Sequence, residues 1–139
     1  MTEAEAIEFL ADGTHTGKLA TAGVNGEPHV APVWFLVEGR DLVFSTGRES
    51  VKGRHLRANP QAALTVDIER FPYHFVAARG AVEVTEDPPD LQDWASRIAE
   101  RYVPEGEAER YGEVNSGPGN LLCRLRMDHL TGERDISLI

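Results

Sequence analysis

The segment from Ser45 to Pro60, with the sequence STGRESVKGRHLRANP, concentrates cationic side chains that could bind an anion. Its cations are Arg48, Lys52, Arg54 and Arg57, and Glu49 is the only acidic residue among them. The whole chain is acidic, with 14 Lys and Arg against 23 Asp and Glu and a formal net charge of -9. A local cationic cluster in an acidic chain favours a small anionic ligand.

Hydroxyl side chains accompany Lys52 in this segment. Ser45 and Thr46 end a predicted strand, and Ser50 is the predicted N-cap of a helix over residues 50–58. The first amides of a helix carry partial positive charge, so a lysine in the first turn is unfavourable for the helix. A bound phosphate would remove this penalty, and we therefore predict an anion site here. A solvated helix face without a ligand is the alternative interpretation.

Two other segments could contact a flat ligand. Pro32 interrupts the strand predicted over residues 28–37, and because proline lacks an N–H it indicates a sheet edge or a bulge. Backbone groups of Val33 and Trp34 would then be free for a ligand, although proline also protects plain edge strands against aggregation. The segment FPYHF, residues 71–75, could wall a planar ligand or cover one end of a barrel.

Several classes of function are disfavoured by the sequence. The histidines show no metal-binding spacing, and the lone Cys123 is predicted to be a small buried hydrophobe. Net negative charge argues against nucleic acid as a partner. The first residues show neither a basic leader nor a long apolar run, so we expect no secretory signal and no membrane partner. One unpaired cysteine is typical of a reducing compartment, and we expect a cytoplasmic protein.

The elements that must position these residues are mostly short strands. A length of 139 residues predicts one domain, residues 1–139. Asn25-Gly26 and Glu38-Gly39 predict hairpin turns between strands. Helices are predicted over 3–11 and 50–58, after an N-cap at Asp87, and over 105–115. Strands are predicted over 17–23, 28–37, 41–46, 62–68, 74–84, the segment GNLLCRLRM, and 130–138.

Hairpins between consecutive strands predict an antiparallel sheet, and six or seven short strands favour closure into a barrel or a sandwich. The fold class we predict is mainly β, a small barrel with peripheral helices. The helix that follows Asp87 has an apolar face, which we interpret as core packing.

Together, these motifs resemble the flavin-binding split-barrel superfamily, the pyridoxamine 5'-phosphate oxidase-like proteins. The resemblance lies in NGEPHVAPVWF, in LVFSTGRESVKGRHLRANPQAALTVD, in the aromatic stretch that leads to GAVEV, and in GNLLCRL. It is good from Gly17 to Val84 and weaker from Asn120 to Ile136. Within the superfamily, the chain is most similar to the actinobacterial branch that binds the deazaflavin coenzyme F-420.

The resemblance implies a six-stranded antiparallel split barrel in a homodimer, with a cofactor at the interface. It implies an oxidoreductase in which coenzyme F-420, or alternatively FMN, transfers a hydride to or from a planar small-molecule substrate. The implied cofactor-binding residues are Ser45, Thr46, Ser50 and Lys52 at the phosphate, Pro32, Val33 and Trp34 along the ring, and Tyr73 and Phe75 from the other side or the other subunit. The carboxylates of the coenzyme tail would then meet Arg54, with Arg48 and Arg57 as alternatives.

Two alternatives stay open for the function. One is an FMN-binding relative of pyridoxamine 5'-phosphate oxidase, although the chain has Ser50-Val51-Lys52 where such oxidases tend to have Ser-Arg-Lys. The other is a flavin or haem carrier without turnover, since no residue is an evident proton donor and Tyr73 and His74 are candidates only by proximity.

Overall fold

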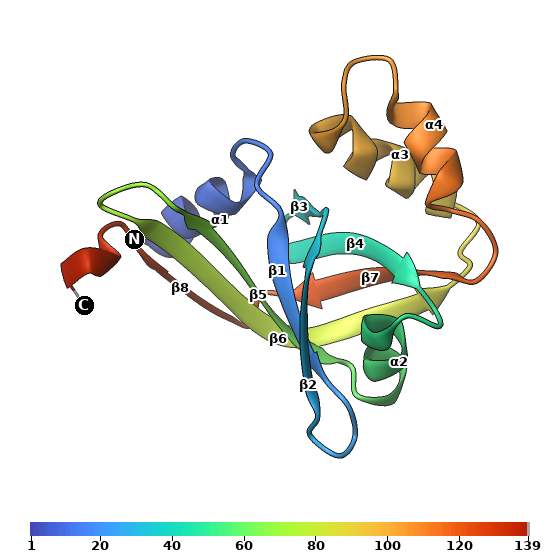
Figure 1. The fold of residues 1–139 in the computed structure, drawn as a ribbon, viewed down its shortest axis with the longest axis horizontal. Helices are drawn as coiled ribbons and strands as arrows, with labels where there is room; N and C mark the ends of the chain where they lie inside the picture. The colour runs from blue at the N-terminus through green and yellow to red at the C-terminus, as the bar shows by residue number, and fades with distance from the viewer. Residues whose placement is uncertain (139) are drawn as a thin grey trace.

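The computed structural model describes residues 1–138, in which eight strands form one antiparallel sheet with four α-helices around it (Figure 1). The strand order is β2-β1-β5-β6-β7-β4-β3, and β8 pairs with β6 off this path. The strands are β1 Gly17–Ala22, β2 Pro28–Val33, β3 Leu36–Glu38, β4 Asp41–Gly47, β5 Gln61–Ile68, β6 His74–Glu86, β7 Asn120–Arg126 and β8 His129–Glu133. The helices are α1 Glu3–Ala11, α2 Val51–Ala58, α3 Leu91–Tyr102 and α4 Ala108–Val114, with a 3-10 turn at Ile136–Leu138.

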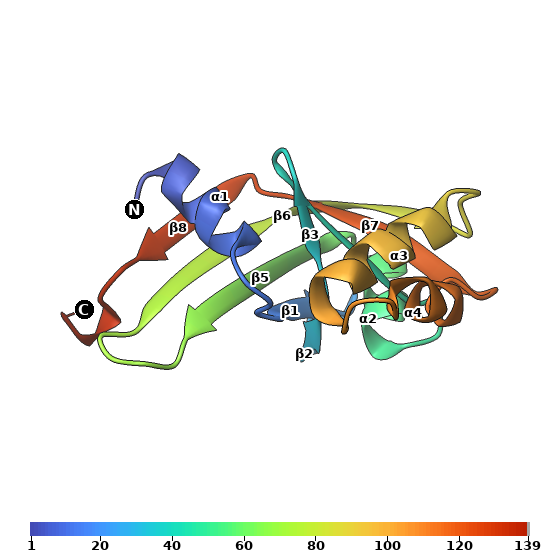
Figure 2. The same ribbon diagram turned by 90° about the horizontal axis from the view of Figure 1, so that it is seen from above.

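The long strand β6 joins the two halves of the curled sheet. Its first part pairs with β5 and β8, and its second part pairs with β7. At the crossing, a Cβ on Gly80 would lie 2.1 Å from the carbonyl oxygen of Arg126, so only glycine fits. Because the backbones approach so closely here, β6 can pair with strands of both halves. The sheet curls into the half-closed barrel seen from above (Figure 2).

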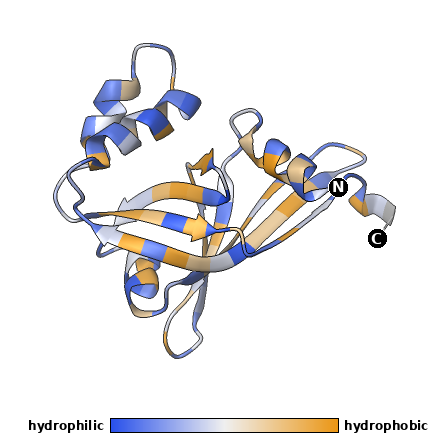
Figure 3. Cartoon of the chain, turned by 180° about the vertical axis from the view of Figure 1, so that it is seen from behind, coloured by the Kyte–Doolittle hydropathy of each residue, from blue (hydrophilic) through white to orange (hydrophobic). Residues whose placement is uncertain are grey.

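The inner face of the curled sheet holds the main core. Side chains alternate in and out along the strands, so that Leu19, Leu64 and Ala78 point inward from neighbouring strands. Leu56 of α2 and Leu10 of α1 are completely buried in the same cluster. Figure 3 shows apolar residues recurring along the strands, whereas α3 and α4 are mostly hydrophilic.

A second, smaller core lies on the outer face of β4 and β7. Here α3 covers Val43 and Leu122 with its own Leu91 and Trp94. Alternation along GNLLCRLRM predicted Leu122 on the opposite side from Cys123, and the register places it there. Leu122 is nevertheless buried, because α3 packs on that side.

Most predicted elements are present, and the mainly β, antiparallel split-barrel prediction is confirmed with eight strands rather than six. One extra strand arises because the strand predicted over 28–37 breaks at Trp34 and Phe35. The Asn25-Gly26 turn is longer than predicted: the loop covers residues 23–27, and Gly26 takes a φ of 83° while the Asn25 side chain accepts a hydrogen bond from the Glu27 amide.

Two boundaries were predicted wrongly. The N-cap of α3 is Asp90, not Asp87; Asp87 has a φ of 42° and its Oδ1 accepts a hydrogen bond from the Gly119 amide. The strand predicted over 130–138 ends at Glu133 and is followed by the 3-10 turn. Residue 139 lies outside the described part. Within residues 1–138, no helix has the length and apolar character needed to cross a membrane.

Candidate functional site

A cleft of about 510 Å³ lies where β2, β4, α2, α3 and α4 meet. Most of the site residues predicted from the sequence line it: Pro32, Val33, Trp34, Ser45, Thr46, Ser50 and Lys52. The remaining lining residues are Gly47, Ala95, Ile98, Tyr111, Val114, Asn115 and Asn120. Segments from four separate parts of the chain thus form a single concave site of ligand-binding size.

The anionic end of the cleft is built from the turn between β4 and α2. Ser50 is the N-cap of α2, as predicted: its Oγ accepts a hydrogen bond from the Gly53 amide at 3.0 Å and donates to the Gly47 carbonyl at 2.7 Å. Thr46 Oγ1 lies 3.1 Å from the same Oγ. The Ser50 hydroxyl is therefore engaged in the cap, and Thr46 donates its own proton to Ser50 Oγ, so Ser45 is the hydroxyl left to donate to a ligand.

The first turn of α2 leaves donors without partners. Among the hydrogen bonds of residues 1–138, the amides of Val51 and Lys52 have no acceptor. No acidic residue lies in this turn, and the Lys52 ammonium has no carboxylate within 4.0 Å in the described chain. Positive charge from the helix dipole and from Lys52 is thus uncompensated at the cleft, which is the arrangement that binds phosphate.

A glycine fixes how closely α2 approaches β4. A Cβ on Gly53 would lie 2.0 Å from the carbonyl oxygen of Gly47 and 2.9 Å from that of Arg48. Any larger residue would push the first turn of α2 away from the strand end. Gly53 therefore sets the distance between the α2 amides and the Thr46 hydroxyl.

The other cations of the segment do not gather at the cleft. Arg48 pairs with Glu49 at 3.6 Å and with Glu86 at 3.3 Å, and Arg57 pairs with Glu49 at 3.6 Å. Arg54 is exposed and unpaired within residues 1–138, but it lies about 200° around the helix from Lys52. The sequence suggested one cationic patch, and the structure separates it into Lys52 at the cleft, an ion-pair cluster, and Arg54 on another face.

The opposite end of the cleft is aromatic. Trp34 stacks on Tyr102 of α3, with ring centroids 5.3 Å apart and 7° between the planes. Tyr111 of α4 lies 6.2 Å from Trp34 at 59°. Pro32 lies on β2, which is an edge strand as predicted and pairs only with β1. The cleft therefore has a flat aromatic wall in addition to its cationic end.

Tyr73 and Phe75 do not line this cleft. They belong to the β5–β6 hairpin, whose tip lies at the other end of the molecule from α2 (Figures 1 and 2). Tyr73 has a φ of 64° and is 42% exposed, and Phe71 beside it is 74% exposed. His74 shares this location, so neither Tyr73 nor His74 is close to the cleft of its own chain.

The sequence did not identify the residues that α3 and α4 contribute. The apolar face of α3 was interpreted as core, and it does bury Leu91 and Trp94, but Ala95 and Ile98 also line the cleft. In α4, Tyr111 carried no distinguishing signal, since a single tyrosine on a polar helix is common. Only the folded arrangement shows that it faces Trp34.

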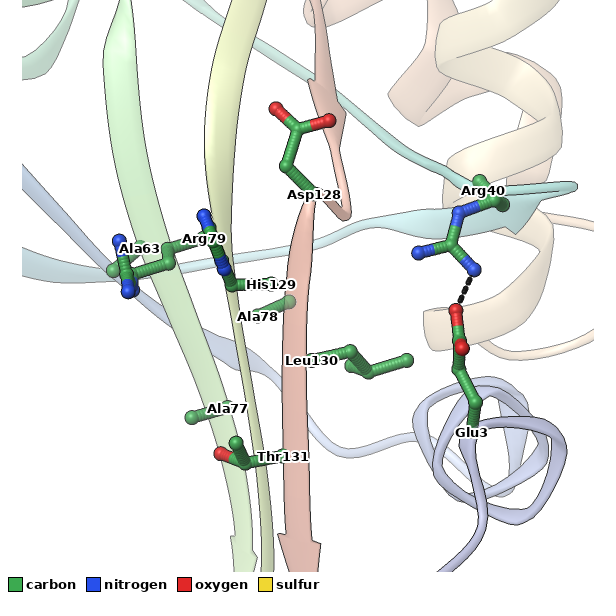
Figure 4. Close-up of a pocket in the computed structure, with 10 residues that line it drawn as sticks. All are labelled: Glu3, Arg40, Ala63, Ala77, Ala78, Arg79, Asp128, His129, Leu130 and Thr131. Carbon is green, nitrogen blue, oxygen red and sulfur yellow. Dashed lines mark hydrogen bonds and ion pairs between the residues drawn. The ribbon is translucent and has the colours of Figure 1, made fainter.

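A second hollow, of about 430 Å³, lies on the outer face of β5, β6 and β8 (Figure 4). Its floor is made of small residues such as Ala63 and Ala77, and its rim includes Arg79, His129 and the Glu3–Arg40 ion pair. Glu3 and Arg40 neutralise each other in this ion pair, so neither charge is left for a ligand. Arg79, Asp128, His129 and Thr131 are its other polar lining residues.

Cys123 is buried on the inner face of β7, and the prediction of a small buried hydrophobe is confirmed. Burial raises the pKa of its thiol to about 12. The thiol therefore stays protonated near neutral pH and is no nucleophile.

The fold and the cleft together define the class of protein: a split barrel with a cleft that has a cationic end and an aromatic wall. The sequence model of the family described as pyridoxamine 5'-phosphate oxidase matches residues 3–120. The chain therefore belongs to the pyridoxamine 5'-phosphate oxidase family, in the flavin-binding split-barrel superfamily.

Individual relatives agree with this assignment. The chain is 37% identical over 116 residues to a pyridoxine/pyridoxamine 5'-phosphate oxidase of Burkholderia ambifaria, covering 81% of this chain and 52% of the relative. It thus spans about half the length of the curated relatives it matches. A solved F420 reductase has a TM-score of 0.72 and 27% identity, covering 89% of this chain and 94% of that one.

A conserved hypothetical protein of Mycobacterium tuberculosis shares the fold, with a TM-score of 0.77 and 23% identity over 95% of this chain and 84% of that one.

Proposed function

We propose that this protein is an oxidoreductase that binds a flavin-type cofactor in the cleft, with coenzyme F-420 as the first candidate and FMN as the alternative. The observation that carries the proposal is the layout of the cleft. A cationic end without acidic neighbours, made by Lys52 and the α2 amides, lies in one cavity with the aromatic wall made by Trp34 and Tyr111. A phosphorylated ring compound has this same distribution of charge and apolar surface.

The residues of the chain have separate tasks in this proposal. Lys52 and the free amides of α2 hold the phosphate, and the Ser45 hydroxyl donates a further hydrogen bond to it. Trp34 supports the ring, and α3 and α4 exclude water from one side of it. The cofactor supplies the hydride chemistry, while the protein supplies orientation and a dry site.

The choice of coenzyme F-420 rests on two supports. One is the similarity to the F420 reductase, at 27% identity. The other is Arg54, an exposed cation without an ion-pair partner in residues 1–138, which an oligoglutamate tail would reach if it leaves the cleft and passes around α2 to the face opposite Lys52. FMN has no such tail and needs only the site at Lys52.

A carrier without turnover is the second candidate function, and one observation favours it. No histidine or carboxylate lines the cleft, so the described chain offers no strong general acid there. Rapid mixing of the protein, loaded with reduced cofactor, with planar acceptors separates the two: an enzyme oxidises the cofactor faster than the free cofactor reacts, and a carrier does not.

We also propose that the protein is a homodimer in which the partner completes the site. A face of small residues, including Ala20, Ala63 and Ala77, crosses β1, β5 and β6 without a covering element in residues 1–138. Val30, on the same face of the edge strand, is 66% exposed. A second copy packed on this face would cover apolar surface and bring its aromatic hairpin, with Tyr73, toward the cleft.

The direct test is a titration of the purified protein with coenzyme F-420 and with FMN, followed by absorbance and fluorescence. We expect saturable binding of at least one of them with one cofactor per chain, and tighter binding of coenzyme F-420. Absence of binding by both would contradict the proposed function, and tighter binding of FMN would select the alternative cofactor.

A further inference from the structure

The break between β2 and β3 places Trp34 in the wall of the cleft and leaves the backbone without a neighbouring strand. Phe35 lies in this break, and side chains of α3 bind its backbone instead. Its amide donates to Tyr102 Oη at 3.3 Å, and its carbonyl accepts from Arg101 Nη1 at 2.8 Å. Buried backbone groups need partners, and here two side chains replace the sheet ladder.

The Tyr102 ring also holds the indole next to Phe35. It lies parallel to Trp34 at 5.3 Å and covers one face of that ring. Its hydroxyl donates to the carbonyl of His15 at 3.0 Å, which anchors the ring to the segment before β1. Burial raises the pKa of Tyr102, so the hydroxyl stays protonated and remains a donor near neutral pH.

Arg101 stabilises the same arrangement by binding the C-terminal end of α1. Its guanidinium donates to the carbonyls of Leu10, Asp12 and Gly13 at 2.9, 3.3 and 2.9 Å. It also lies over the Phe35 ring, 4.7 Å from its centroid. Helix α1 has no basic residue in its own last turn, so Arg101 compensates the negative end of that helix. The position of the break is thereby fixed to both α1 and α3.

From these contacts we propose that Tyr102 is a positioning residue: it holds Trp34 as a fixed wall and thereby sets the affinity of the cleft for the ring of its ligand. This inference rests on the proposed function, and it concerns a residue that does not itself line the cleft. Because Tyr102 covers one face of the indole, a ligand ring can meet only the other face or the edge. A wall that is ordered before binding loses little conformational entropy when the ligand arrives.

The inference separates the two ends of the cleft, which allows a sharp test. Tyr102→Leu removes the stacked ring and the hydroxyl, whereas Tyr102→Phe removes the hydroxyl and keeps the ring. Both are made in a Trp94→Phe background, so that Trp34 is the only fluorescent indole. Three quantities are measured: acrylamide quenching of Trp34 in the ligand-free protein, affinity for the phosphate-free rings riboflavin and 8-hydroxy-5-deazariboflavin, and the competition constant of inorganic phosphate against FMN.

We expect Tyr102→Leu to increase Trp34 quenching and to weaken ring binding about two- to twelvefold, the range of one aromatic pair. Phosphate competition should stay unchanged, since within residues 1–138 the contacts of Tyr102 are with His15, Trp34 and Phe35 and none of them is with Lys52 or α2. Tyr102→Phe should keep most of the affinity for the ligand ring. A variant that had lost its fold would not bind the ring, so this result would also show that the fold is intact.

Three outcomes overturn the inference, and they differ from one another. If the unsubstituted protein binds FMN and the phosphate-free rings, but Tyr102→Leu leaves quenching and ring affinity unchanged, then Tyr102 has only a structural role. If the ring and phosphate affinities fall together in Tyr102→Leu, the residue supports the whole cleft rather than Trp34. If the unsubstituted protein binds no flavin or deazaflavin at all, the proposed function fails first and the inference fails with it.

Discussion

Replacing Lys52 by alanine should weaken cofactor binding without weakening the fold. The ammonium lines the cleft beside the free amides of Val51 and Lys52, and it forms no ion pair within the described residues. A charge-assisted contact to a phosphate contributes about 1.5–3 kcal/mol. At about 1.4 kcal/mol per decade, Lys52→Ala should raise the dissociation constant about 10- to 150-fold.

The ligand-free Lys52→Ala protein should be as stable as the unsubstituted protein or slightly more stable. A cation in the first turn opposes the dipole of α2, so its removal relieves a repulsion of about 0.3–1 kcal/mol at most. The assay is a pair of measurements: fluorescence titration with FMN, which has no tail for Arg54 to bind, and thermal unfolding without ligand. Arg54→Ala is the matched control, because it removes the same charge from the same helix at a position that does not line the cleft.

Two results would refute this reasoning. An unchanged dissociation constant for FMN in Lys52→Ala would place the phosphate elsewhere and leave α2 a solvated helix. Equal losses of FMN affinity in Lys52→Ala and Arg54→Ala would mean that net charge attracts the cofactor and that no specific contact exists.

The remaining predictions test other parts of the molecule. If Arg54 binds a coenzyme tail, Arg54→Glu should weaken tailed coenzyme F-420 and spare a tail-less analogue, with a loss that shrinks at high salt; equal effects on both forms would exclude a tail contact. If the small-residue face is the dimer interface, Ala63→Arg should give a monomer by light scattering, whereas the unsubstituted protein should bury more than about 1,000 Å² in a dimer. Gly112→Ala places a Cβ 2.0 Å from Ser96 Oγ and 2.8 Å from its Cα, so α4 should move off α3, with a loss of about 1–3 kcal/mol in the free energy of unfolding by denaturant titration. Hydrogen bonds from the Thr2 backbone and from the Arg134 side chain lower the pKa of Glu5 to about 2. The contribution of the Glu5 carboxylate to stability is therefore present above pH 4.5 and is lost as the pH falls toward 2. Glu5→Gln should lower the melting temperature at pH 6 but not at pH 2.

Local features of the fold could be predicted from the sequence because neighbouring residues determine them. The Ser50 N-cap, the glycine after Glu38 and the alternation in GNLLCRLRM act over a few residues, and each appears where it was expected. The errors occurred where distant segments compete for the same residues. Asp87 looked like a helix cap, but the Gly119 amide takes its carboxylate, and the helix starts after Asp90.

The break in the strand predicted over 28–37 has a similar cause. The run VAPVWFLV reads as continuous β structure, and its apolar residues are compatible with one long strand. In the fold, Tyr102 and Arg101 bind the backbone of Phe35, so the ladder is not needed there and β3 can turn toward β4. No pattern within 28–37 indicates this, because the responsible side chains lie more than sixty residues later in the chain.

The same distinction explains which end of the cleft the sequence revealed. The cationic end is formed by one contiguous segment, from Ser45 to Gly53, so its chemistry could be predicted from the order of its residues. The aromatic end requires β2, α3 and α4 together, and by our proposal also a partner subunit. Its residues come close together only in the folded chain, so they could not be identified from the sequence. Phosphate affinity should therefore depend on a short stretch of chain and tolerate changes in α3 and α4. Ring affinity should respond to substitutions such as Tyr102→Leu and Gly112→Ala, which lie outside that stretch and do not line the cleft. A family that keeps the first segment and varies the helices would retain its phosphate anchor while changing the ring environment, and with it the substrates that can approach the cofactor.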